Sequence, residues 1–169
     1  MKKIKSIVIC CMVAMIMSSF EALAAPYNPS QYTSVEVESG LLPSNTRISR
    51  VIAKNVLRGA FFASGELTIL NNNGKIRVSA KTYMKEPVDE VYLTIYVDRL
   101  IDNSWSQVAY YDFEFYAEDY PDGLIDPGVD FTITDQPSGY YYRLRGSYAA
   151  IKDGAMEGFG PVTDGVLIE

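Results

Sequence analysis

The pattern of apolar and polar positions changes character along the chain. Residues 25 to about 43 are rich in Pro, Ser, Asn and Gly without regular apolar spacing, which predicts a flexible arm. From Gly59 onward apolar and polar residues alternate with a period of two, as they do in half-buried β-strands. The clearest case is residues 91–101, where every second residue from Val91 to Val97 is aliphatic and would face one side of a sheet.

The alternating segments predict seven strands separated by turn-forming residues. Asn-Asn-Asn-Gly at 71–74 and Asp-Asn-Ser at 102–104 fit tight turns, because Asn and Gly accept positive φ at low cost. Seven strands at this spacing are typical of a single antiparallel β-sandwich of the immunoglobulin or fibronectin type III kind, with a small closed barrel as the alternative. The expected strands span residues 61–70, 76–84, 91–101, 105–116, 129–134, 140–149 and 161–168.

One short segment before the first expected strand follows helical spacing instead. Ser44 and Asn45 are suited to cap a helix, and apolar residues then recur at intervals of three and four up to Leu57. We interpret the segment as a short helix, or an irregular strand, at the edge of the domain. A basic helix that touches a surface is the other interpretation, since Arg50 and Lys54 would lie on other faces.

The first 24 residues have the organisation of a secretory signal peptide. Three lysines among the first five residues precede an apolar run over residues 7–17, and Ala-Leu-Ala at 22–24 is a small-x-small cleavage site. The run is short for a stable membrane anchor, which is the alternative. We therefore expect cleavage after Ala24 and a secreted protein with an arm over residues 25–56 and a sandwich over residues 57–169.

The cysteine and histidine content removes several kinds of chemistry from the secreted form. The chain has no histidine, and its two cysteines, Cys10 and Cys11, lie inside the expected signal peptide. Disulfides, thiol nucleophiles, Ser-His-Asp triads, Cys/His zinc sites and haem ligation are therefore excluded for this form. The remaining 145 residues are enough to build one hydrophobic core without such links.

The charge of the secreted form is strongly negative. Loss of the signal removes three lysines and Glu21, which leaves 12 basic and 20 acidic residues and a net charge of −8. Such a surface repels nucleic acid and anionic lipid, so neither is expected as a partner. We see no second apolar stretch suited to a membrane span.

The stretch DFTITDQPSGYYYRLRGSYAA resembles the region between the E and F strands of fibronectin type III domains. There a short strand leads to a turn with proline, a corner tyrosine, and then alternating apolar and Arg positions. Tyr140 matches the corner tyrosine, whose hydroxyl bonds back to the backbone. On a strand, the even-numbered residues from Tyr140 to Gly146 would point to the core and the odd-numbered ones to the outer face.

A second resemblance covers most of the chain from Leu57 to Glu169. The stretches RGAFFASGELTI, EPVDEVYLTIYVDRL, NSWSQV, GYYYRLRG and TDGVLI occur in this order. They are similar to a family of small secreted proteins of Gram-positive bacteria known only as a domain of unknown function. The resemblance implies a secreted single β-domain and brings no known activity.

Carboxylates are the side chains left for acid–base chemistry. A glycoside hydrolase would need two of them facing each other across a sugar. Sequence spacing alone does not show such a pair, and small β-sandwiches seldom build such clefts. We therefore expect a non-enzymatic protein without a cofactor, with a carboxylate-dependent glycoside hydrolase as the remaining alternative. The loop EDYPDGLIDPGVD offers hard oxygen ligands for Ca²⁺ but lacks the order of an EF-hand, which favours a solvated loop. The weak Ca²⁺ candidates are Asp119, Asp122, Asp126 and Asp130.

The candidate binding site consists of residues that would share one outer sheet face. Tyrosine offers a flat apolar ring and a hydroxyl, which suit both sugars and protein partners. We therefore expect a module that binds a glycan, a cell-wall component or a protein, with a structural or protein-interaction module lacking a small ligand as the alternative. The candidates are Tyr92, Tyr96, Tyr110, Tyr116, Tyr141, Arg143 and Arg145. Otherwise the two arginines merely pair with Asp98, Asp112 or Glu114 at little net energy.

Overall fold

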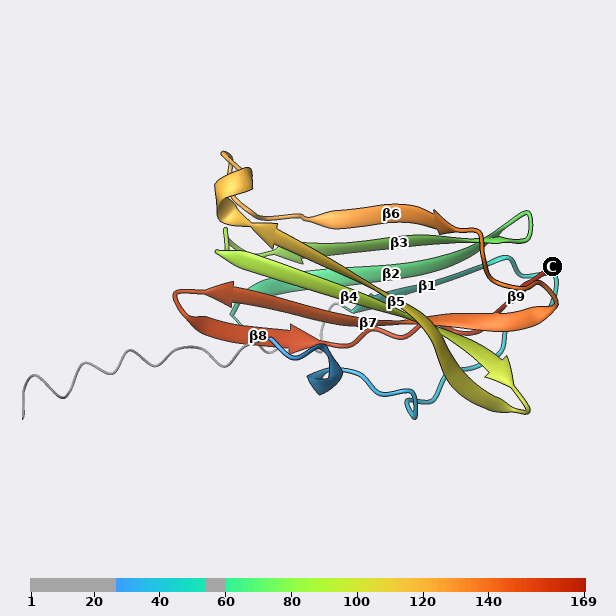
Figure 1. Ribbon diagram of the computed structural model, residues 1–169. Coiled ribbons are helices and arrows are strands. Elements are labelled where there is room, and N and C mark those ends of the chain that lie inside the picture. Colours follow the sequence, from blue (N-terminus) through green and yellow to red (C-terminus); the bar gives the residue numbers. More distant parts are fainter. Residues whose placement is uncertain (1–26, 54–59) are drawn as a thin grey trace, which may run out of the picture.

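The structure is a computed structural model that describes residues 27–53 and 60–169. Two antiparallel sheets pack face to face, as Figure 1 shows. The predicted all-β sandwich is therefore confirmed. The expected signal peptide lies outside the described residues and stays a prediction. Among the described residues, no helix combines the length and the apolar character needed to cross a lipid bilayer.

The smaller sheet has four strands and the larger has five. In spatial order the four-stranded sheet consists of β1 (Ile48–Ala53), β2 (Phe62–Asn72), β3 (Lys75–Met84) and β6 (Gly128–Ile133). The five-stranded sheet consists of β5 (Ser104–Tyr116), β4 (Glu90–Ile101), β7 (Tyr140–Lys152) and β8 (Ala155–Phe159), and β9 (Val166–Ile168) also pairs with β7. Two single 3-10 turns complete the described elements: η1 (Pro29–Gln31) and η2 (Ala117–Asp119).

Three hairpins turn through two residues with positive φ. The turn residues are Asn73-Gly74 between β2 and β3, Asp102-Asn103 between β4 and β5, and Asp153-Gly154 between β7 and β8, with φ from 49° to 78°. Turns of this hand match the natural twist of the paired strands. The first two turns confirm the sequence-based prediction. The third turn, Asp153-Gly154, was not predicted. The strand that follows it, β8, was not predicted either.

The segment assigned to a helix is an extended strand. β1 pairs antiparallel with β2, from Ile48 opposite Leu70 to Ala53 opposite Gly65. Ile48 and Ile52 point away from the core and are 50% and 39% exposed. Because apolar residues occupy both faces of β1, their spacing imitated that of a helix. Of the two interpretations of this segment, the edge strand is confirmed and the helix is wrong for residues 48–53, and the sandwich includes residues before position 57. Residues 54–59, the rest of the predicted helix, lie outside the described part.

The number of strands also differs from the prediction. The described chain has nine strands rather than seven, because β1 and β8 were missed. The last expected strand, residues 161–168, is only partly regular: β9 begins at Val166, and before it Val162 makes a single bridge to Arg145. Short strands with few alternating positions leave a weak signal in the sequence.

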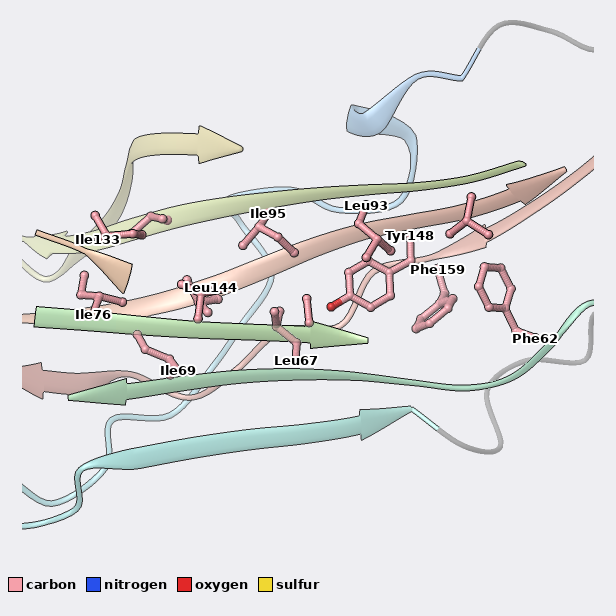
Figure 2. Packing of buried hydrophobic residues seen from close by; sticks show 14 of the residues in the cluster. Phe62, Leu67, Ile69, Ile76, Leu93, Ile95, Ile133, Leu144, Tyr148 and Phe159 are labelled. Atoms are coloured by element: carbon pink, nitrogen blue, oxygen red, sulfur yellow. The ribbon is translucent and has the colours of Figure 1, made fainter. Parts of the chain in front are cut away.

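The hydrophobic core fills the space between the two sheets. In Figure 2, Leu67 and Ile69 of β2 point toward Ile95 of β4 and Leu144 of β7, and all four are fully buried. Burying each such side chain stabilises the fold by about 1.5–3 kcal/mol. The Tyr148 hydroxyl donates a hydrogen bond of 2.8 Å to the carbonyl of Glu66 on the opposite sheet, so the one polar atom of that ring is satisfied.

The corner tyrosine is Tyr142 rather than Tyr140. The Tyr142 hydroxyl donates to the carbonyl oxygen of Pro137 at 2.7 Å, and the residue is fully buried. Tyr140 is 42% exposed and its ring lies 5.0 Å from the guanidinium of Arg99. The placement of Tyr140 at the corner and in the core is therefore wrong. Tyr140 is the first residue of β7 and pairs with Ile168 of β9.

The arm packs on the domain instead of extending from it. In Figure 1 it runs along the five-stranded sheet, on the side away from the four-stranded sheet. Leu41 forms a parallel bridge to Gly165, and the Leu42 amide donates to the Gly165 carbonyl at 2.9 Å. A Cβ on Gly160 would lie 2.0 Å from the Tyr32 carbonyl oxygen, so arm and sheet are in direct backbone contact. The described part of the predicted linker is thus a packed element.

Candidate functional site

The predicted binding residues share the outer face of the five-stranded sheet. β4 pairs with β5 on one side and with β7 on the other, which confirms that these three strands belong together. Tyr96 lies opposite Tyr110 on β5 and opposite Arg145 on β7. The rings of Tyr96 and Tyr110 are 6.4 Å apart, and the Arg145 guanidinium lies 4.7 Å from the Tyr96 ring.

Two of these residues form a buried ion network. Asp98 accepts hydrogen bonds from Arg143 Nε at 3.0 Å and from Arg145 Nε and Nη2 at 2.6 and 3.0 Å. Asp98 and Arg143 are fully buried, and Arg145 is 2% exposed. The arginines do point to the outer face and pair with Asp98, but the expectation of little net energy applies to exposed pairs, and these pairs are buried. Outer residues are buried here because the arm covers them.

Backbone groups of the arm close over Arg143. Its Nη1 donates to the Val37 carbonyl at 2.5 Å and to Ser39 Oγ at 2.9 Å, and its Nη2 donates to the Val35 carbonyl at 2.6 Å. The Trp105 ring lies 4.6 Å from the same guanidinium. Burial lowers the pKa of Arg143, while the hydrogen bond to Asp98 opposes that shift.

The arm also covers Tyr92. The Tyr27 ring stacks on the Tyr92 ring at 4.8 Å, with 21° between the planes. The Tyr27 hydroxyl donates to the Ser147 carbonyl at 3.0 Å and lies 3.2 Å from Thr94 Oγ1. Burial raises the pKa of Tyr27, because the phenolate would lose its hydration. Tyr92 is thus a docking residue for the arm and one of its ring faces is occupied.

What remains open is a strip along β5. Tyr110 is 60% exposed and Tyr116 36%, and the exposed carboxylates Asp112 and Glu114 lie between them. Asp112 accepts a hydrogen bond of 2.7 Å from Thr94 Oγ1. Glu114 accepts one of 2.5 Å from the Tyr116 hydroxyl. The strip therefore combines aromatic rings with fixed hydrogen-bond acceptors.

A groove of about 700 Å³ separates part of the arm from the sheet. Its walls include the rings of Tyr96 and Trp105, and Arg145 and Gln107 contribute polar groups from the sheet. Gln107 Oε1 accepts a hydrogen bond of 3.1 Å from Arg145 Nη2, which orients both side chains. The arm contributes Ser30, Thr33, Ser34 and Val35 to the lining.

The carboxylates considered for Ca²⁺ do not converge. Asp126 pairs with Lys81 at 2.8 Å, and Asp130 pairs with Arg77 at 3.0 Å. Asp119 and Asp122 are exposed on the loop. In the described part of the chain no three metal-ligating side chains come together.

Sequence reasoning missed the contribution of the arm. Tyr141 lies opposite Leu167 of β9 and is not part of the groove, whereas Thr33, Gln107 and Tyr27 carry contacts and were not considered. The sequence does contain one indication that the arm packs on the domain: Tyr27 and Tyr32 are large aromatic residues in a segment predicted to be a linker.

Comparison with known proteins adds no identity. No model of a known protein family matches the chain, and no curated protein matches it. The resemblance to a family of small secreted β-domains therefore stays a prediction. An all-β sandwich is compatible with a binding or structural module, and fold alone does not select between them.

Proposed function

We propose that the protein is a secreted, non-enzymatic module that binds a glycan in the groove between the arm and the five-stranded sheet. The observation that carries the proposal is the pairing of two aromatic walls, Tyr96 and Trp105, with the polar side chains of Gln107 and Arg145 in one groove. Ligand sites commonly combine apolar walls with a few fixed polar groups. Aromatic rings stack on the C–H faces of sugars, while polar groups meet their hydroxyls.

The groove is held in shape before any ligand arrives. Arg143 ties the arm backbone to the sheet through Val35 and Val37, and Val35 itself lines the groove. Tyr27 fixes the arm further along. Binding to a rigid site loses less conformational entropy than binding to a mobile one, which supports a function in recognition.

The proposal is tested with the purified protein on a panel of neutral and acidic polysaccharides by affinity electrophoresis. We expect retardation by at least one polysaccharide, and loss of it in Trp105→Ala. Tyr83→Ala is the matched control, because Tyr83 is an aromatic residue of the four-stranded sheet that lies beside Lys81, away from the groove. Circular dichroism and thermal unfolding check that both variants fold. Binding that survives Trp105→Ala in a folded protein would refute the groove as the site.

The free edge of β5 favours a second candidate, a protein-interaction module. β5 is 13 residues long, contains neither Pro nor Lys, and in the described part of the chain pairs with β4 alone. Long unprotected edges accept a further strand. Asp112 and Glu114 would suit an extended partner segment with basic side chains. Charge reversal in Asp112→Lys/Glu114→Lys should abolish capture of such a partner and leave glycan binding in the groove intact.

A further inference from the structure

We infer that the groove recognises an anionic group on its glycan, a carboxylate or a phosphate, and that Arg145 binds this group. The inference rests on the proposed function and names the ligand class of the same site. Three observations carry it: the charge balance beneath the groove, an unpaired donor on Arg145, and an unpaired hydroxyl on the arm.

The ion network beneath the groove carries more positive than negative charge. Arg143 and Arg145 share the single carboxylate of Asp98. The other hydrogen bonds of Arg143 go to carbonyl and hydroxyl oxygens of the arm, which bear no charge. Glu36 of the arm attracts Arg143 electrostatically, but it is exposed to solvent and accepts no hydrogen bond from either arginine. A buried cation without its own anion favours the approach of one.

Arg145 lines the groove and keeps one hydrogen-bond donor free. Its Nε and Nη2 bind Asp98 and Gln107, whereas Nη1 makes no hydrogen bond to the described residues. The residue is 98% buried and lines the groove. A guanidinium presents its donors in one plane and pairs strongly with carboxylate and phosphate oxygens. Tyr96 and Asp98 hold this plane in place, so the free donor has a defined direction.

The arm supplies a second unpaired group. Thr33 lines the same groove, and its Oγ1 is buried without a hydrogen-bond partner in the described part of the chain. A hydroxyl can donate to an oxyanion, and so can that of the neighbouring Ser34, whereas the Ser30 hydroxyl already donates to Asn28 Oδ1 at 2.8 Å. The groove therefore offers donors from both of its sides, which matches a ligand group made of acceptor oxygens.

The net negative charge of the protein limits which anionic ligands can approach the groove. The full chain carries a net charge of −6, so a dense polyanion is repelled at long range. An isolated acidic group on a mostly neutral sugar meets less repulsion and still reaches Arg145. We therefore expect single uronic acids or sparse phosphates on a glycan, and not nucleic acid.

The test uses matched probes that differ only in charge. Isothermal titration compares tetragalacturonate, and a glucuronate-containing oligosaccharide, with their methyl esters, and a phosphorylated oligosaccharide with its dephosphorylated form. We expect at least tenfold tighter binding of one acidic form than of its neutral counterpart, with affinity falling between 50 and 500 mM NaCl. Which pair shows the difference tells carboxylate from phosphate.

Single substitutions test whether the preference for the acidic probe arises in the groove. Arg145→Gln should abolish the preference for the acidic probe, and Thr33→Val, which removes only a hydroxyl, should reduce it several-fold with thermal stability unchanged. Thr68→Val, on the outer face of the four-stranded sheet opposite Arg50, is the matched control. Equal binding of acidic and neutral forms would overturn the inference and leave the proposed function standing. Failure of every polysaccharide to bind would overturn both.

Discussion

The outer faces of the two sheets carry similar ion pairs in opposite surroundings. On the four-stranded sheet, Arg77 and Asp130 pair at 3.0 Å with side chains that are 50% and 49% exposed. On the five-stranded sheet, Arg143 and Asp98 pair at the same distance with no exposure at all. The distance is equal, and the difference lies in what covers the pair: solvent on one sheet, the arm on the other.

This contrast separates two properties of an outward-facing residue: the face of the sheet that it occupies, and whether that face is in contact with water. Alternation along a strand tells which residues share a face, and it placed Arg143 and Asp98 on the outer face correctly. It does not tell whether that face meets water. A solvated ion pair contributes little to stability, whereas removing one member of a buried pair leaves an uncompensated charge in a medium that hydrates it poorly.

The largest effect should come from removing the shared carboxylate. Asp98→Ala leaves two buried guanidinium groups without their anion, and we expect a loss of about 3–5 kcal/mol in the free energy of unfolding. The matched change Asp130→Ala on the open face should cost less than about 1 kcal/mol. Urea unfolding followed by tryptophan fluorescence measures both. Similar losses in the two variants would mean that the arm does not shield the Asp98 network.

Alkaline pH should loosen the covered face. The pKa of Tyr27 is raised by burial and that of Tyr92 by burial and its bond to Glu90, and the negative charge of Asp112 raises that of Tyr27 further. Both tyrosines regain hydration and ionise more readily once the arm has left the sheet, whereas the bond of Tyr92 to Glu90 lies within β4 and stays. Docking is therefore at full strength below pH 10 and weakens above it, by at most about 1.4 kcal/mol per pH unit for each tyrosine.

Limited proteolysis between pH 8 and pH 10.5 tests this dependence. Cleavage within residues 27–42 should accelerate with pH in the parent protein, after correction for the pH profile of the protease on a peptide substrate. Tyr27→Phe should show a shallower dependence, because it lacks one of the two ionising groups. Parallel profiles in parent and variant would contradict the assignment.

The smallest expected effect concerns the hydroxyl group of Tyr27 and its contribution to docking of the arm. Tyr27→Phe keeps the ring that stacks on Tyr92 and removes the hydroxyl that bonds to Ser147. We expect a loss of about 0.5–1.5 kcal/mol in docking of the arm at pH 7. Hydrogen exchange should report faster opening of the arm while the amides of β4 and β7 keep their protection. A uniform loss of protection over the whole sandwich would show that arm and core unfold as one unit.

Prediction from the sequence worked where the information is local. The aliphatic alternation in β4 and the Asn73-Gly74 turn depend on residues next to each other in the chain, and both were identified. The helical interpretation of β1 was wrong because Ile48 and Ile52 place apolar side chains on the solvent face of the strand. The corner tyrosine was placed two residues early, since the hydroxyl of Tyr142, and not that of Tyr140, bonds back to the Pro137 carbonyl.

The candidate site was predictable only in part. Tyr96, Tyr110 and Arg145 were assigned to one face from strand alternation, and the register brings them together. Thr33 and the burial of Arg143 were beyond reach, since the hydrogen bonds that cover Arg143 join residues more than 100 positions apart. No local pattern records a contact of that range.

By itself the sequence determined the absence of histidine chemistry, the negative charge, the alternation that makes strands, and the turns that pair them, because each follows from composition or from neighbouring residues. The tertiary structure alone decided the position of the arm. That position converts an outward Arg143 into a buried one, leaves Tyr110 in solvent, and shapes a groove beside Arg145. The physical reason is that burial and electrostatic strength depend on what lies above a side chain, and here that is a distant segment of the same chain.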